Sequence, residues 1–183
     1  MKKLLVVGMI ILLVGMSIPS TGINVERTST VSYDGKTLYV GGDGPGNYSK
    51  IQDAIDNASS GDTVFVYNGT YYESLIVDES INLLGENKNS IIEAGYWDIA
   101  VRIAADGVNI SGFTIQNCWH GIHVSYYTPV ENVIITGNNL SNIFNLGIHV
   151  GECSNVLVSN NYLFCNGGNT SSGGQYFNKR KYY

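Results

Sequence analysis

An internal repeat of about 25 residues limits the folds open to this chain more than any other feature. Segments of one pattern begin at Val108, Val133 and Val156, which are 25 and 23 residues apart, and Ile81 begins a shorter version 27 residues earlier. Apolar and polar residues alternate within each segment, which is typical of a β-strand and not of a helix. A unit this short cannot bury its apolar side alone, so neighbouring units are expected to stack.

A second strand-like segment lies between the first ones and repeats in step with them. Its copies read Ala-Val-Arg-Ile, Gly-Ile-His-Val and Gly-Ile-His-Val, and they begin at Ala100, Gly121 and Gly147. The fifth position of the first segment is held in turn by Gly85, Gly112, Gly137 and Asn160. Because Gly and Asn tolerate a left-handed backbone, we expect each unit to bend at this position.

Stacked units of this kind predict an all-β fold, a right-handed parallel β-helix of about four coils. Each strand pairs with its counterpart in the next coil, about 4.8 Å away, and equivalent side chains form columns inside. The predicted inward columns are Val101–Ile122–Ile148, Ile103–Val124–Val150 and Val108–Val133–Val156. The alternative, an antiparallel sandwich, predicts hairpin turns every 8–12 residues or so and no repeat near 25.

A short helix is expected before the first coil, where it covers the open N-terminal end of the stack. Ser49 is the candidate N-cap, and Gln52 follows three residues later, which is the pattern of a capping box. One face of this helix carries the apolar residues Ile51, Ala54, Ile55 and Ala58. We therefore predict a short N-terminal capping helix.

The ends of the chain differ from the repeat region. Residues 1–22 combine Lys2 and Lys3 with an apolar run and a small-residue stretch, which predicts a signal peptide; the alternative is a retained N-terminal membrane anchor. We expect a linker over 23–37, the β-helix domain over 38–166 and an irregular tail over 167–183. No C-terminal cap is legible, which predicts either a truncated chain or an open end capped by a partner or by self-association.

Composition excludes some classes and adds candidate modification sites. Charged residues make up 14% and the net charge is −5, which disfavours a coiled coil and a nucleic-acid partner. Export favours oxidation, but three cysteines, Cys118, Cys153 and Cys165, allow at most one internal disulfide. Export also makes the six Asn-x-Ser/Thr sequons candidate glycosylation sites, namely Asn47, Asn57, Asn68, Asn109, Asn139 and Asn169.

Residues 48–66 read Tyr-Ser-Lys-Ile-Gln-Asp-Ala-Ile-Asp-Asn-Ala-Ser-Ser-Gly-Asp-Thr-Val-Phe-Val, and Asn-Gly-Thr-Tyr-Tyr-Glu and Ile-Asn-Leu-Leu-Gly-Glu follow at 68–73 and 81–86. These stretches resemble the start of pectin lyase-like right-handed parallel β-helix proteins, above all the NosD-like and surface β-helix repeat group. The resemblance extends over about residues 38–166. It implies the fold but not the activity, because the same entry motif serves esterases, lyases, hydrolases and non-enzymes.

The family's catalytic motifs are absent from this sequence. The paired-Asp and Gly-Arg-x-Trp contexts of pectin methylesterases do not occur, nor does the Gly-His-Gly motif of polygalacturonases. We therefore expect a non-catalytic module and leave the question of enzyme activity open. The resemblance implies two alternatives, an incomplete polysaccharide lyase or hydrolase and a NosD-like accessory protein for copper delivery.

The second repeat segment also places polar residues on the outside of the coil. If its apolar residues face inward, Arg102, His123 and His149 face solvent and form a ladder with a spacing of about 4.8 Å. The preceding turn is expected to add two ladders beside His120, which are Trp97–Cys118–Phe144 and Asp98–Trp119–Asn145.

These positions predict a carbohydrate-binding surface. Aromatic faces stack on sugar rings while polar groups fix their orientation, and an arginine attracts an acidic polymer. The candidate ligand-binding residues are Trp97, Asp98, Arg102, Trp119, His123 and His149. The alternative is that the repeat forces such ladders without any ligand.

Metal binding and catalysis are further interpretations of the same residues. His120, His123 and His149 are candidate metal ligands because imidazole suits copper, but no Cys-x-x-Cys or His-x-x-x-His spacing supports them, and no other cofactor is expected. Acid–base chemistry by Asp98 with Arg102, or by Glu152 near His149, needs two groups that flank a substrate. The sequence singles out no such pair, so no catalytic residue is predicted.

Taken together, these observations predict a secreted, cell-surface or periplasmic β-helix module with a structural or carbohydrate-binding role. Its expected partner is a polysaccharide or a cell-surface glycan. Contact with a membrane is expected only through an uncleaved N-terminal segment.

Overall fold

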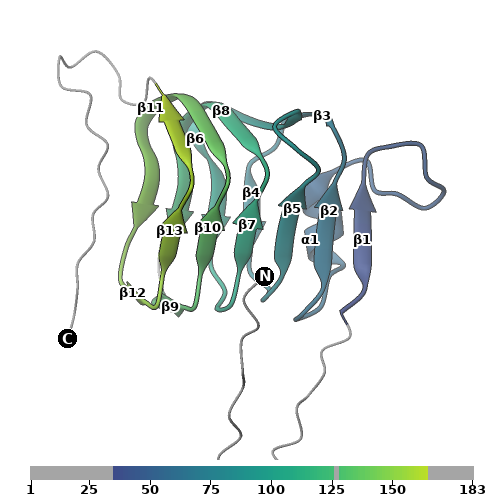
Figure 1. Ribbon diagram of the computed structural model, residues 1–183, viewed down its shortest axis with the longest axis horizontal. Coiled ribbons are helices and arrows are strands. Elements are labelled where there is room, and N and C mark those ends of the chain that lie inside the picture. Colours follow the sequence, from purple (N-terminus) through teal and green to yellow (C-terminus); the bar gives the residue numbers. More distant parts are fainter. Residues whose placement is uncertain (1–34, 126–127, 165–183) are drawn as a thin grey trace, which may run out of the picture. The chain divides into compact units, whose positions relative to one another are not determined.

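The computed structural model describes residues 35–125 and 128–164, which belong to the second of two compact units, residues 32–183. The first sheet contains, in spatial order, β1 (Thr37–Val40), β2 (Thr63–Val66), β5 (Asn82–Gly85), β7 (Asn109–Ser111), β10 (Ile134–Thr136) and β13 (Leu157–Ser159). Figure 1 shows these six strands side by side.

The second sheet contains the longest strands. Its order is β14 (Tyr162–Phe164), β11 (Asn139–Val150), β8 (Thr114–Val124), β6 (Ser90–Ile103) and β3 (Gly69–Tyr71), and β4 (Leu75–Val77) also pairs with β6. A third, small sheet pairs β12 (Cys153–Ser154) with β9 (Val130–Glu131).

All strand pairs within the described ranges are parallel, and strands from successive passes of the chain lie next to one another in each sheet. The predicted right-handed parallel β-helix is therefore confirmed, and the antiparallel sandwich is wrong. The solenoid has about five turns and not about four. The difference arises because β1 and β2, which precede the repeat recognised in the sequence, stack in the same register.

The predicted inward columns are also confirmed. Val101 pairs with Ile122 and Ile122 with Ile148, while Ile103, Val124 and Val150 pair in the same way. The third column follows from backbone hydrogen bonds, because the N–H groups of Ile134 and Leu157 donate to the carbonyls of Val108 and Val133. Val108 and Val133 are fully buried, whereas Val156 in the last coil is only half-buried.

The bend at the fifth repeat position is confirmed at three of its four members. Gly112, Gly137 and Asn160 have positive φ values of 85°, 67° and 55°. Gly85 does not, so the expectation of a left-handed residue there is wrong. A glycine is still needed at this position because a Cβ on Gly85 would lie 2.8 Å from the carbonyl oxygen of Gly112 in the next coil.

The predicted N-terminal helix is present as α1 (Ile51–Asp56), and it buries Ile51, Ala54 and Ile55. The capping box is wrong, since the N-cap is Lys50 and no side chain of the helix start caps it. The carboxylate of Glu73 instead accepts hydrogen bonds from the backbone N–H groups of Ile51 and Gln52, at 2.9 and 3.0 Å. A negative charge suits the exposed N–H groups at a helix start, so a residue from the next coil caps the helix.

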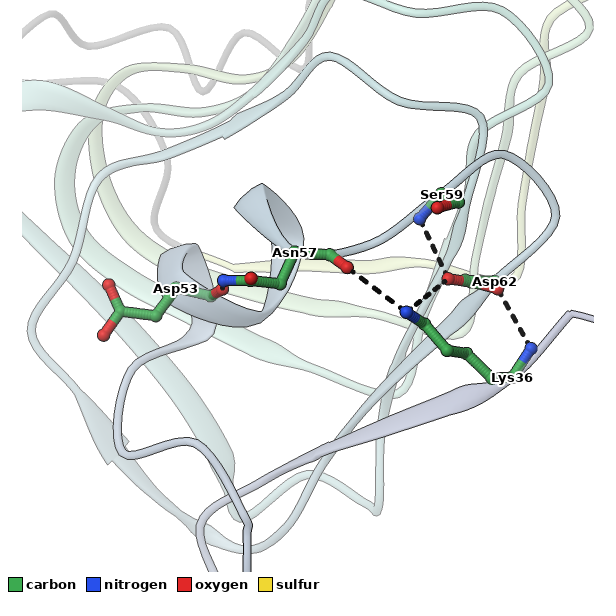
Figure 2. A network of polar contacts seen from close by, with 5 residues as sticks. All are labelled: Lys36, Asp53, Asn57, Ser59 and Asp62. Atoms are coloured by element: carbon green, nitrogen blue, oxygen red, sulfur yellow. Dashed lines mark hydrogen bonds and ion pairs between the residues drawn. The ribbon is translucent and has the colours of Figure 1, made fainter.

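A second set of contacts ties the start of β1 to the loop that follows α1 (Figure 2). The buried carboxylate of Asp62 accepts hydrogen bonds from the backbone N–H groups of Lys36 and Ser59, each at 2.9 Å. The Lys36 ammonium group lies 3.8 Å from the same carboxylate and donates to the carbonyl of Asn57 at 3.5 Å. These bonds fix the N-terminal edge of the stack.

Several predictions lie outside the described residues. They are the signal peptide over 1–22, most of the linker over 23–37, the tail over 167–183 with its supposed truncation, Cys165 and the sequon at Asn169.

Cys118 and Cys153 are free cysteines. Across 35–125 and 128–164, the structure contains no helix with the length and apolar character needed to span a membrane.

Candidate functional site

The three long strands β6, β8 and β11 share an irregularity at one point of the coil. Before it, Cys118 of β8 pairs with Gly95 and Ile143, and after it, His120 pairs with Ile99 and Leu146. The strands carry bulges of unequal length between these pairs, made of Tyr96, Trp97 and Asp98 in β6, of Trp119 in β8, and of Phe144 and Asn145 in β11.

The two turn ladders expected from equal spacing are therefore wrong. Cys118 does not pair with Trp97 or Phe144, because the bulge of β6 is longer than that of β8 and shifts the register. Cys118 is fully buried, and burial raises the pKa of its thiol to about 12. This cysteine belongs to the core and not to the outer surface.

Two asparagines lie just before the bulges of β8 and β11. Asn117 and Asn142 have left-handed φ values of 56° and 52°, which an Asn tolerates better than most residues. The side-chain amide of Asn142 donates to the side-chain oxygen of Asn117 at 2.6 Å, so the two bends are held together across neighbouring coils.

The bulges bring aromatic side chains to the surface. The rings of Trp97 and Trp119 lie 5.6 Å apart and are tilted by 32°. Tyr96 of β6 and Phe144 of β11 are 4.5 Å apart although β8 lies between their strands, because the shorter bulge of β8 lets the longer ones meet. Trp97 is 83% exposed and Tyr96 56%, so a large aromatic area faces solvent.

The predicted ladder of Arg102, His123 and His149 is confirmed in its register. The expectation that it faces solvent is wrong for His123, which is only 8% exposed. The ring of His120 stacks on that of His123 at 5.6 Å, and the ring of His149 lies 4.3 Å away on the neighbouring strand. All three histidines of the chain thus lie in one cluster.

Burial keeps this cluster uncharged. Desolvation lowers the pKa of His120 and of His149, and in His120 the charge of His149 adds to the effect. The pKa of His123 falls to about 4, first through desolvation and then through the charges of His149, His120 and Arg102. The imidazoles are therefore neutral at pH 7, beside the cationic Arg102.

A neutral imidazole has one donor and one acceptor nitrogen. Only some of these nitrogens in the cluster have a hydrogen-bond partner within the described ranges. Nε2 of His120 lies 3.3 Å from the side-chain amide of Asn145. Nδ1 of His120 and Nδ1 of His149 are buried and make no hydrogen bond to any residue that the structure describes.

The predicted copper ligands receive no support from this geometry. Within the described part of the chain, no group of three or more His, Cys, Asp or Glu residues is arranged to hold a metal ion. Of the proposed acid–base partners, Asp98 is exposed in the β6 bulge. Glu152 is exposed beyond the end of β11 and lines a shallow hollow with Pro129, Val130, Glu131, Cys153 and Ser154.

We refer to this surface as the aromatic–histidine patch, defined by Tyr96, Trp97, Trp119, His120, His123, Phe144 and His149. Four of the six predicted ligand-binding residues are members, and Arg102 adjoins it through His123. Asp98 lies in the same bulge as Trp97 and is exposed. The predicted ligand-binding residues did not include Tyr96, and the predicted ladders aligned Phe144 with the wrong residues. Both follow closely on a Gly or Asn with a left-handed backbone, Gly95 and Asn142, and this pattern could have indicated the bulges.

The five described sequons occupy different environments. Asn57 and Asn68 are exposed, whereas Asn47, Asn109 and Asn139 are half-buried.

Comparison with known proteins supports the fold and gives one relative. No family model matches the chain. A cell surface glycoprotein of Methanothermus fervidus is 32% identical over 99 residues, which is 53% of this chain and 16% of that protein. This chain therefore matches only a small part of the length of that relative.

The crystal structure of an alginate lyase from a Paenibacillus species is similar with a TM-score of 0.55. The likeness covers 69% of this chain and 44% of the lyase at 17% sequence identity, so it concerns the fold alone. The parallel β-helix is thus a known architecture, and the fold alone assigns no chemistry to this chain.

Proposed function

We propose that this chain is a β-helix module of a cell-surface protein and that it binds carbohydrate through the aromatic–histidine patch. The name of the Methanothermus relative supports the location, since that protein is a cell surface glycoprotein. The exposed pair of Trp97 and Trp119 carries the proposal for carbohydrate binding.

The tryptophan pair supplies the apolar part of such a site. Sugar rings present C–H faces that pack on aromatic rings, and Trp97 offers an indole that is 83% exposed. A ladder with only a structural role would gain stability by burying this side chain against the sheet. The exposure of Trp97 therefore favours a role in ligand binding over a role in shielding the sheet from solvent.

The polar neighbours fit the same ligand class. Neutral imidazoles both donate and accept hydrogen bonds, which matches the hydroxyl groups of a sugar, and His120 and His149 are the partly exposed members of the cluster. His120 and Asn145 already form a polar pair beside Trp119, with a ring contact of 6.2 Å between Trp119 and His120. Arg102 adds a positive charge next to His123, which favours a glycan with acidic groups.

Retention on insoluble polysaccharides tests the proposal. The purified chain is applied to cellulose, chitin, immobilised alginate and immobilised polygalacturonate, and bound protein is measured. We expect retention on at least one matrix and a loss of about tenfold in Trp97→Ala. This corresponds to about 1.4 kcal/mol, which is near the upper end of what a stacked aromatic pair contributes.

Tyr72→Ala is the matched control. Tyr72 is 78% exposed but lies outside the patch, between β3 and β4, so its removal should leave retention unchanged. Equal losses in both variants, or no retention on any matrix, would contradict the proposal.

A further inference from the structure

The structure separates the candidate glycosylation sequons into two groups. We propose that Asn57 and Asn68 carry N-linked glycans in the folded protein, and that Asn109 and Asn139 do not. The proposal rests on the proposed function only in requiring that the chain is exported.

Asn68 is an exposed acceptor. It lies at the corner between β2 and β3, and both Asn68 and Thr70, which completes its sequon, are exposed. The corner is held by its backbone, since the N–H of Asn68 donates to Glu86 and the N–H of Gly69 donates to the carbonyl of Asn89. A glycan on the Asn68 amide therefore replaces none of the bonds that fix this turn.

Asn57 is exposed directly after α1, and Ser59 of its sequon is exposed as well. Its side-chain amide nitrogen donates to the carbonyl of Asp53 at 2.8 Å, as Figure 2 shows. A primary amide carries two hydrogens, and attachment of a sugar replaces one of them. The remaining hydrogen can keep the bond to Asp53, so a glycan at Asn57 is compatible with the helix end.

Asn109 and Asn139 have a different environment because they lie inside parallel ladders. Asn109 of β7 pairs on its two sides with Asn82 and Ile134. Neighbouring strands lie only about 4.8 Å away, so a glycan there would crowd the side chains of both coils. The side-chain oxygen of Asn109 is already buried, without a hydrogen bond to any described residue.

The same holds for Asn139 of β11, which pairs with Thr114 and Tyr162. Its side-chain oxygen is buried, and its amide nitrogen lies 3.5 Å from the hydroxyl of Thr114. Asn47 is also expected to stay unmodified, because it is half-buried and its amide group lies close to Gly44, where an added Cβ would be 2.9 Å from both the amide nitrogen and the amide oxygen.

The two accepting positions leave the proposed binding surface free. Asn57 follows α1 and Asn68 lies between β2 and β3, whereas the aromatic–histidine patch is formed by β6, β8 and β11. N-linked glycans are bulky and solubilising, so this placement covers the N-terminal coils and keeps Trp97 accessible.

Peptide mapping by mass spectrometry tests the proposal. The chain is secreted, with the host's own leader in place of residues 1–22, from a host that glycosylates exported sequons. A C-terminal peptide with an added Asn-Gly-Thr sequon reports that the transferase has met the chain, and only a host that occupies this reporter is used. In the folded, secreted protein we expect glycans on the Asn57 and Asn68 peptides and unmodified Asn109 and Asn139 peptides.

Two variants sharpen the result. Asn68→Gln should lower the intact mass by one glycan, whereas the matched Asn109→Gln should leave the glycan mass unchanged. An unmodified Asn68 with an occupied reporter, or a glycan on Asn109 or Asn139, overturns the proposal. The retention experiment on polysaccharides is carried out with unglycosylated protein. A failure of carbohydrate binding can therefore be distinguished from a failure of glycosylation.

Discussion

The interior of the coils and the outer corner of β6, β8 and β11 differ in how their side chains align between neighbouring coils. Inside, one residue of each coil stacks on one residue of the next, as Leu83, Ile110 and Ile135 do. At the corner, the three strands insert bulges of different lengths, and side chains from non-adjacent strands, such as Tyr96 and Phe144, come into contact.

This difference separates stability from function. A column of buried apolar residues requires the repeat, because each coil must present the same shape to its neighbours. A binding surface requires a departure from the repeat, because identical coils place the same residue type in each position and form a flat surface. The bulges after Asn117 and Asn142 provide that break while the strands on both sides remain in register.

The largest effect is expected for an interior residue. Ile135 is fully buried in β10 and its neighbour Ile134 faces outward with 39% exposure, so the two form a matched pair. Ile135→Ala should lower the free energy of unfolding by about 3–4 kcal/mol, and Ile134→Ala by less than about 1 kcal/mol. Denaturant unfolding measures both, and similar losses would show that the two faces do not differ as described.

The next effect concerns acid and the histidine cluster. Between about pH 6.5 and pH 4 the unfolded chain protonates His123 while the folded chain does not, so stability is full above that range and is lost as the pH falls. The fall of the pKa from 6.5 to about 4 corresponds to a loss of about 3 kcal/mol.

Unfolding measured near pH 7 and near pH 4 checks this sign and size. His123→Gln should show a shallower loss toward acid than the parent chain, whereas Trp97→Ala should keep the full loss. An unchanged pH dependence in His123→Gln would mean that this buried imidazole is not the group responsible.

A smaller effect is expected at Asn117, the left-handed residue just before the β8 bulge. Asn117→Ala should cost about 1–2 kcal/mol, because alanine is strained in the left-handed backbone and cannot accept the bond from Asn142. Asn117→Gly keeps the backbone conformation and loses only that bond, so it should cost less. Unfolding midpoints rank the two variants, and a larger loss for glycine would contradict this account of the bend.

The smallest effect on stability is expected at the most exposed residue of the patch. Trp97→Ala should change the free energy of unfolding by no more than about 0.5 kcal/mol, because Trp97 is 83% exposed. Thermal and denaturant unfolding measure this change. A loss as large as that of Ile135→Ala would mean that the tryptophan is part of the core and not a binding residue.

The sequence predicted the interior well because strict alternation and a repeat near 25 leave few alternatives. Val101, Ile122 and Ile148 were placed correctly on this basis. The sequence could not align the bulges, since equal spacing was assumed where β6 inserts more residues than β8. It also could not foresee that His120 would stack on His123, because the bulge of β8 directs these side chains, or that Glu73 would cap α1, because that contact depends on how separate coils meet.

Tryptophan fluorescence gives the most direct test of the proposed binding surface. The chain has only two tryptophans, Trp97 and Trp119, and both lie in the aromatic–histidine patch. Titration with a soluble form of a retained polysaccharide should change their emission in a saturable manner, and Trp97→Ala should abolish most of that change. Retention of the polysaccharide with unaltered tryptophan emission would contradict the assignment and place the binding surface elsewhere on the coil.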